Sequence, residues 1–312
     1  MENSFPLMNA PPIPSGSWPV MLTPFSSDGS VDRAGLRALV DFYIDHGSAG
    51  LFATCLSSEI EELGRDEIVE IARSVVEDAR GRVPVVAGAV LDGTLEEIVS
   101  LVKAVAATGP AAVVIAAGTL VPAEADESAW RQAFARLMAE TPGVPLGIYE
   151  CPWPNHRVLS PETMAWLAKT DRVVFHKDTA CDAEEVRAKC AAVAGSGLAF
   201  FNADLTTFEA SQRAGAAGYS GVGCNFAPDL LAAACAAPGD AGLKRLLARL
   251  NALIPPGYPA NAKRFLALRG VPISELCRKN AVADEANLLQ LEEFKHDLDQ
   301  WNVARLVTAS AA

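Results

Sequence analysis

The chain has 312 residues, half of them apolar, and a formal net charge of −12. This length supplies a large core, and single-domain α/β barrels commonly have it. An acidic chain repels phosphate backbones and anionic lipid headgroups, so we expect neither a nucleic acid nor a membrane surface as a partner. A small anionic substrate stays open, because a few fixed N–H donors outweigh the overall charge locally.

Other sequence features favour a cytoplasmic protein without a metal. The seven cysteines show no C-x-x-C spacing, which is typical of reduced thiols. Residues 1–17 are rich in Pro and Ser, and we interpret them as a loose arm rather than a signal peptide. No run reaches the ~18 apolar residues of a bilayer-spanning helix. The four histidines lack the spacing of metal ligands, so we expect no metal.

Eight short apolar runs alternate with amphipathic stretches in residues 18–228. Most runs are continuous, which is typical of strands in a parallel sheet covered on both faces. Their spacing of roughly 30 residues favours a closed (β/α)8 TIM barrel, and no G-x-G-x-x-G motif follows the first run. The predicted strands begin near Pro19, Gly50, Val83, Ala111, Pro145, Arg172, Leu198 and Gly218.

Three helix starts carry capping residues. Asp32 is a candidate N-cap, Thr94 and Glu97 form a candidate capping box, and Ser160 precedes a proline suited to the first helical turn. From about residue 228 the pattern is purely helical, with candidates at 243–254, 262–269 and 285–307. We therefore expect residues 229–312 to form a C-terminal helical extension packed on the barrel.

Polar side chains follow three of the predicted strands, at the end of a barrel where active sites lie. Lys177 ends the run VVFHK, Tyr149 ends PLGIY, and Ser57-Ser58-Glu59 follows GLFAT. A buried lysine has a lowered pKa, and only the neutral amine attacks a ketone to form an imine. The alternative is a lysine that reaches solvent or pairs with Asp178 or Asp204. Tyr149, likewise, is either a proton relay or an ordinary residue of the barrel rim.

The order of motifs from Trp18 to about Asn225 resembles the dihydrodipicolinate synthase / N-acetylneuraminate lyase superfamily. Each motif is short, but six occur in the same order over about two thirds of the chain. They are Thr23-Pro24-Phe25 with Asp28 to Asp32, Ser58-Glu59 with Leu63, Arg82 to Gly88, Ile148 to Pro152, His176 to Thr179, and Arg213 to Gly221.

The resemblance implies a class I aldolase or lyase in which Lys177 forms a Schiff base with pyruvate or a related 2-oxo acid. Tyr149 is then the general acid and base, and the turn with Ser57 and Ser58 binds the substrate carboxylate. No cofactor is needed, because the lysine supplies the electrophilic activation itself. The resemblance also implies a homo-oligomer, either a dimer or a tetramer.

Departures from the family pattern argue against dihydrodipicolinate synthase itself. Leu56 stands where the family has the first hydroxyl of the turn, and Cys55 and Ser58 replace its two glycines. Thr119 stands at the position of a tyrosine after strand four, and Pro154 replaces an arginine that binds the aldehyde substrate. The sequence thus predicts imine chemistry without specifying the second substrate.

The loop of residues 150–157 is expected to select that second substrate. Glu150 and Arg157 are candidate substrate contacts, although Arg157 is alternatively a solvated or intersubunit residue. Thr119, Asp204 and Asn225 are candidates for the pocket wall. The leading prediction is a carbon–carbon lyase. The rivals are a hydro-lyase of a deoxy sugar acid and a catalytically weakened protein that binds a 2-oxo acid.

Overall fold

The barrel consists of eight parallel strands whose neighbours pair in the order β1-β8-β7-β6-β5-β4-β3-β2. The structure is a computed structural model that describes residues 12–310 apart from 91, 256 and 280. A parallel bridge between Val20 and Phe52 joins the chain after β1 to β2 and closes the barrel. The predicted (β/α)8 fold is therefore confirmed. The strands are β1 Gly16–Ser17, β2 Leu51–Ala53, β3 Val85–Gly88, β4 Ala112–Ala116, β5 Leu146–Tyr149, β6 Val173–Asp178, β7 Ala199–Asn202 and β8 Gly218–Tyr219.

The first strand begins three residues before its predicted start. Gly16 and Trp18 donate backbone hydrogen bonds to β8, but Pro19 has no N–H to continue this ladder. The next backbone donor used in the barrel is Met21, which bonds to Phe52 of β2 instead. Part of the expected N-terminal arm thus belongs to the barrel, while residues 1–11 lie outside the described residues.

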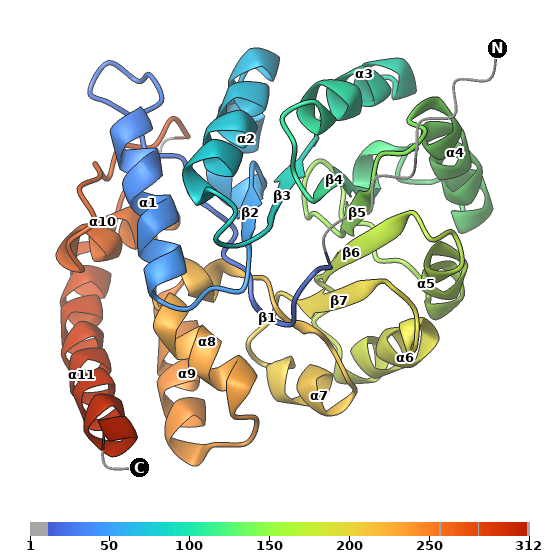
Figure 1. The fold of residues 1–312 in the computed structure, drawn as a ribbon. Coiled ribbons are helices and arrows are strands. Elements are labelled where there is room, and N and C mark those ends of the chain that lie inside the picture. Colours follow the sequence, from blue (N-terminus) through green and yellow to red (C-terminus); the bar gives the residue numbers. More distant parts are fainter. Residues whose placement is uncertain (1–11, 91, 256, 280, 311–312) are drawn as a thin grey trace.

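Eight helices surround the strands (Figure 1). All three predicted caps are confirmed: the side chains of Asp32, Thr94 and Ser160 accept hydrogen bonds from the first turns of α1, α3 and α5. The helices are α1 Arg33–Asp45, α2 Arg65–Ala79, α3 Leu95–Ala106, α4 Glu127–Glu140, α5 Pro161–Ala168, α6 Ala183–Val193, α7 Phe208–Arg213 and α8 Pro228–Ala236.

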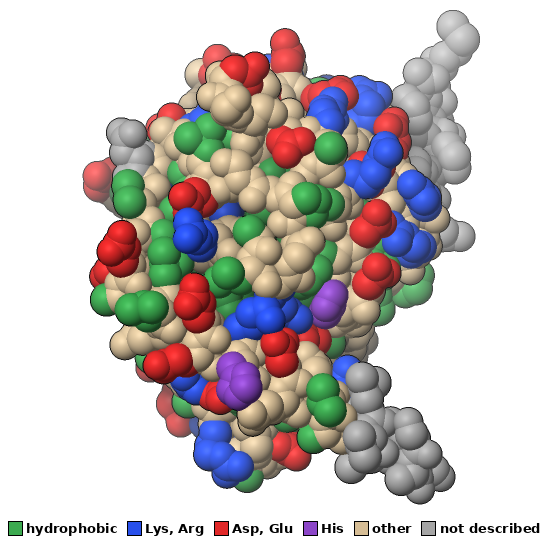
Figure 2. Space-filling view, turned by 90° about the vertical axis from the view of Figure 1, so that its left-hand side faces the viewer, with side chains coloured by type: hydrophobic (Ala, Val, Ile, Leu, Met, Phe, Trp, Pro, Cys, Tyr) green, Lys and Arg blue, Asp and Glu red, His purple; other side chains and the backbone are tan. Residues whose placement is uncertain are grey.

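Three further helices lie beside α1 and α8 on one side of the barrel (Figure 1). They are α9 Ala241–Leu253, α10 Ala260–Leu268 and α11 Glu285–Ser310. Phe265 of α10 packs between Phe226 and Phe294, with ring centroids 5.7 and 6.1 Å away. Acidic, basic and apolar side chains are interspersed on the face that carries α1, α10 and α11 (Figure 2). Within the described residues, none of the helices has the length and apolarity that crossing a membrane demands.

Large aromatic side chains fill the barrel interior. The Phe175 ring lies 5.3 Å from the Trp18 ring, 5.7 Å from the Phe52 ring and 4.8 Å from the Phe201 ring. Successive strand residues face opposite sides, so Lys177 points to the same side of β6 as Phe175. The aromatic cluster therefore forms a floor beneath Lys177.

Candidate active site

Lys177 lies inside the barrel with only 3% of its surface exposed. Its Nζ atom is 3.8 Å from the centroid of the Tyr149 ring on the neighbouring strand. Both alternative partners are engaged elsewhere, because Asp178 binds Lys189 and Asp204 accepts from Thr207. Burial lowers the pKa of the Lys177 amine, which increases the neutral fraction that attacks a carbonyl carbon.

A cavity of about 460 Å³ opens above this lysine at the carboxyl ends of the strands. Tyr149 lines it beside Lys177, and burial followed by the nearby Cys151 and Cys55 raises the pKa of its phenol. Tyr149 is therefore a protonated phenol at neutral pH, which suits it to donate a proton. The structure brings together Lys177, Tyr149, Ser57 and Asp204, which were all predicted site residues, with Tyr258 and Lys279, which were not.

The turn after β2 places one of its two predicted serines at the cavity. Ser57 lines the cavity together with Leu56, the residue that replaces the family's first hydroxyl. The Ser58 hydroxyl instead donates to the Met21 carbonyl at 2.6 Å and accepts from the Cys55 N–H at 3.0 Å. Ser58 thus shapes the turn and is not among the residues that line the cavity, and its contact with the substrate stays a prediction.

Thr119 and Arg157 do not reach the cavity either. The Thr119 hydroxyl donates to the Ala116 carbonyl at 2.9 Å. The Arg157 guanidinium donates to the carbonyls of residues 122, 123 and 125 at 2.9–3.2 Å. Asn155 also binds the Gly118 carbonyl, so these contacts fasten the loop after β5 to the segment after β4. Thr119 and Arg157 therefore make structural contacts here, and their contacts with the substrate stay predictions.

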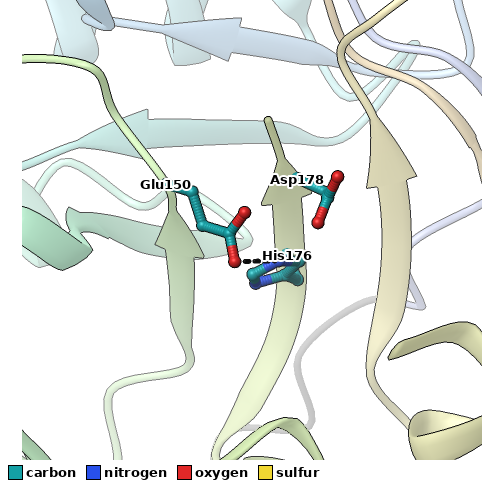
Figure 3. Close-up of side chains that lie close together, drawn as sticks. All are labelled: Glu150, His176 and Asp178. Carbon is teal, nitrogen blue, oxygen red and sulfur yellow. Dashed lines mark ion pairs between the residues drawn. The ribbon is translucent and has the colours of Figure 1, made fainter. Parts of the chain in front are cut away.

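Glu150 belongs to a buried cluster on the other face of the sheet. Figure 3 shows Glu150, just past the end of β5, with its carboxylate toward His176 of β6, and Asp178 at the end of β6. These three side chains are fully buried. Lys189 of α6 donates to Glu150 Oε1 and to Asp178 Oδ2, both at 2.8 Å. The Lys189 ammonium lies between the two carboxylates, where a metal cation would otherwise bind. We therefore interpret the cluster as an ion network rather than a metal site.

This network fixes the loops that border the cavity. Burial acts to raise the pKa of Glu150, but His176 and Lys189 outweigh it and lower the pKa to about 2. The ionised carboxylate accepts from the backbone N–H groups of Leu159 and Thr179. Glu150 therefore positions the segments after β5 and β6 and is not among the residues that line the cavity, and its contact with the substrate stays a prediction.

The outer wall of the cavity is polar. The Thr179 hydroxyl donates to the Glu150 carbonyl, so His156 Nε2, 2.8 Å from the same hydroxyl, is the donor of that contact. Asp204 lines the same wall, where its Oδ2 accepts from the backbone and hydroxyl of Thr207. His156 and Asp204 thus make this wall of the cavity polar, with the Nε2–H of His156 already donated to Thr179.

Asn225 lies behind the cavity wall instead of in it. Its Nδ2 donates to the Val20 carbonyl and to the Tyr258 hydroxyl, both at 2.8 Å, and its Oδ1 accepts from the Tyr43 hydroxyl at 2.9 Å. Asn225 therefore positions Tyr258, which lines the cavity, and its own contact with the substrate stays a prediction.

The C-terminal region supplies a wall that sequence reasoning missed. Tyr258 and Lys279 line the cavity, although neither lies in the eight βα units. The fully buried Glu59 holds this region through Lys263 Nζ at 2.7 Å and the backbone N–H groups of residues 278 and 279. The one available signal was the Gly-Tyr-Pro break between two predicted helices, which marks a turn but does not reveal which residues the turn contacts.

Comparison with known sequences identifies the family. The model of the dihydrodipicolinate synthetase family matches residues 13–298. A 4-hydroxy-tetrahydrodipicolinate synthase of Methylococcus capsulatus is 32% identical over 244 residues, which cover 76% of this chain and 81% of the relative. The corresponding synthase of Thiobacillus denitrificans is 29% identical over 262 residues, covering 84% and 86%.

Solved structures share the fold. A prophage protein of the dihydrodipicolinic acid synthase family from E. coli K12, in complex with pyruvate, has a TM-score of 0.82 and 24% identity over 91% of this chain and 98% of its own. A monomeric dihydrodipicolinate synthase variant has a TM-score of 0.80 and 22% identity, covering 90% and 95%. The barrel, the ordered motifs and the family model agree, and the chain belongs to the dihydrodipicolinate synthetase family.

Proposed function

We propose that the protein is a carbon–carbon lyase that forms an imine between Lys177 and a 2-oxo acid. The observation that carries this proposal is the buried Lys177 amine, which lies beside a phenol and opens into a cavity of about 460 Å³. The family membership supports the same chemistry, since two family structures contain pyruvate. Ser57, on the cavity wall, is the proposed ligand of the substrate carboxylate.

In the proposed reaction the neutral Lys177 amine attacks C2 of the 2-oxo acid. Tyr149 protonates the resulting hydroxyl, which leaves as water and produces an iminium ion beside the Tyr149 phenolate. The phenolate then takes the proton of the C4 hydroxyl, the C3–C4 bond breaks, and its electrons form an enamine on Lys177. The aldehyde departs, Tyr149 protonates C3, and water hydrolyses the imine to release the shorter 2-oxo acid.

We propose that the second substrate differs from that of the synthases named above. Leu56, on the cavity wall, carries no hydroxyl for a proton relay. Pro154 carries no guanidinium for an acceptor carboxylate, and Arg157 is occupied by three backbone carbonyls. The polar groups of His156 and Asp204 suit a hydroxylated chain better than a second carboxylate.

A trapping experiment tests the imine. The protein is incubated with pyruvate and sodium borohydride, and its mass and tryptic peptides are measured. We expect one adduct on the peptide with Lys177, no adduct in Lys177→Met, and a normal adduct in the exposed control Lys169→Met. Failure of every 2-oxo acid to form an adduct would refute the proposal and favour a binding protein.

A hydro-lyase is the second candidate, because the same iminium ion withdraws electrons from a C–O bond as readily as from a C–C bond. The polar wall formed by His156 and Asp204 suits the hydroxyl groups of a deoxy sugar acid. A panel of sugar acids separates the two reactions: a lyase releases an aldehyde, whereas a hydro-lyase yields a product of unchanged carbon count that has lost water.

We also propose that the protein is a homo-oligomer, as the resemblance implies for the family. A monomeric synthase variant with the same fold makes this a question for measurement. Light scattering coupled to size-exclusion chromatography decides it, and a single species of monomer mass would contradict the proposal.

A further inference from the structure

Tyr258 brings a phenol to the cavity from outside the βα units, in addition to those of Tyr149 and Tyr219. It lies between α9 and α10, and its hydroxyl accepts a hydrogen bond from Asn225 Nδ2 at 2.8 Å. Both Ser57 and Tyr258 line the cavity next to Leu56. The Tyr258 phenol thus shares the cavity wall with Ser57, the proposed carboxylate ligand, and with Leu56, where the family hydroxyl is missing.

The orientation of the Asn225 amide determines whether the Tyr258 hydroxyl accepts or donates in the hydrogen bond between them. Asn225 binds the Val20 carbonyl, which only accepts, so that contact must come from the amide nitrogen. The same nitrogen supplies the hydrogen bond to Tyr258, and the amide oxygen accepts from Tyr43. Tyr258 therefore accepts from Asn225, and its own O–H hydrogen is free for Ser57 or for a substrate oxygen.

The carboxylate of a 2-oxo acid needs neutral donors in this cavity. Lys177 is committed to the imine, and Lys279 is paired with Glu61 at 2.8 Å. Burial raises the pKa of the Tyr258 phenol, against smaller opposing effects of Ser57 and Asn225, so the phenol keeps its proton. A protonated phenol that donates to a carboxylate forms a charge-assisted hydrogen bond, which is stronger than a neutral one.

We propose that Tyr258, held by Asn225, donates a hydrogen bond to the carboxylate of the bound 2-oxo acid. This inference rests on the proposed imine chemistry. It assigns a substrate-binding residue to the C-terminal helical region and makes Ser57 and Tyr258 a pair of donors to one anion.

The test compares two ketones with the borohydride trapping assay. Tyr258→Phe removes only the hydroxyl, and we expect the pyruvate concentration for half-maximal adduct formation to rise about 10- to 100-fold, as for loss of a hydrogen bond to a charged group. With hydroxyacetone, which has no carboxylate, half-saturation should change by less than about twofold. The control Thr108→Val removes a hydroxyl that lies outside this cavity, where it donates to the Val105 carbonyl, and should leave the pyruvate half-saturation within about twofold.

The outcomes separate the inference from the function on which it rests. An unchanged pyruvate half-saturation in Tyr258→Phe overturns the inference while the imine stands. An equal rise in half-saturation concentration with pyruvate and with hydroxyacetone also overturns the inference, because the phenol would then affect only the shape of the site. No adduct in the unmodified protein overturns the imine itself, and with it the role of Tyr258.

Discussion

The buried ion network behind β6 yields a prediction that can be developed from its geometry. Lys189 lies 2.8 Å from one carboxylate oxygen of Glu150 and 2.8 Å from one of Asp178, and all three side chains are fully buried. In Lys189→Met the side chain keeps most of its volume but loses its charge. Two carboxylates then face each other with ligand oxygens that lie within 4.8 Å.

Two independent arguments give the same size of effect. Two unit charges 4.8 Å apart repel each other by roughly 3–4 kcal/mol at an effective dielectric constant of about 20. Removal of one partner from a buried ion pair typically costs about 3–5 kcal/mol. With an unfolding entropy of about 2.1 cal/mol/K per residue, a chain of this length should lose about 5–8 °C in Tm.

The pH dependence adds a second readout. In the unmodified protein the pKa of Glu150 is lowered to about 2, so its stabilising contribution is complete above about pH 4.5 and declines as the pH falls toward 2. Without Lys189, mutual repulsion raises the pKa of the carboxylate pair above its unfolded value. The folded variant then gains a proton as the pH falls, and the difference in Tm from the unmodified protein should shrink between pH 8 and pH 5.

Thermal unfolding followed by circular dichroism at both pH values measures these effects. Arg187→Met is the matched control, because Arg187 lies on the same helix in an exposed pair with Glu184 and should change stability by less than about 1 kcal/mol. Lys189→Met/Asp178→Asn removes one of the two facing charges and should recover part of the lost Tm. A Tm of Lys189→Met equal to that of the unmodified protein at both pH values would refute the reasoning.

Three further predictions concern the cavity and its loop. Tyr149→Phe should lower the turnover number about 10²- to 10⁴-fold, because it removes the group that relays the proton. A steady-state assay with the substrate that the enzyme cleaves measures this change, and a smaller decrease would mean that another group moves the proton. The rate of adduct formation with pyruvate should rise with pH and reach its plateau below pH 10.5, the usual pKa of a lysine. Burial lowers the pKa of Lys177, and only the deprotonated amine reacts. A plateau at or above pH 10.5 would contradict this prediction. Arg157→Ala should reduce stability by about 1–3 kcal/mol in urea unfolding, since it leaves three backbone carbonyls without a charged donor; a raised pyruvate half-saturation with unchanged stability would instead support substrate contact.

Local patterns were sufficient for the barrel and for the two central residues. Continuous apolar runs predicted the parallel strands, because both faces of such strands are covered. Strand ends predicted the placement of Lys177 and Tyr149, because the carboxyl ends of parallel strands meet at one rim. These features depend on neighbours in the sequence and on the fold class, so a single chain reveals them.

The remaining site residues depended on which side chains meet across the fold. Ser58 and Glu150 lie one position from Ser57 and Tyr149, but the neighbouring residue faces another direction and finds backbone or Lys189 as its partner. Tyr258 reaches the cavity only because Glu59 binds the C-terminal segment more than 200 positions away and Asn225 orients the phenol. The sequence by itself determined the barrel, Lys177 and Tyr149. The tertiary structure alone decided which of these residues line the cavity, because hydrogen-bond partners far apart in the chain set the direction of each polar side chain.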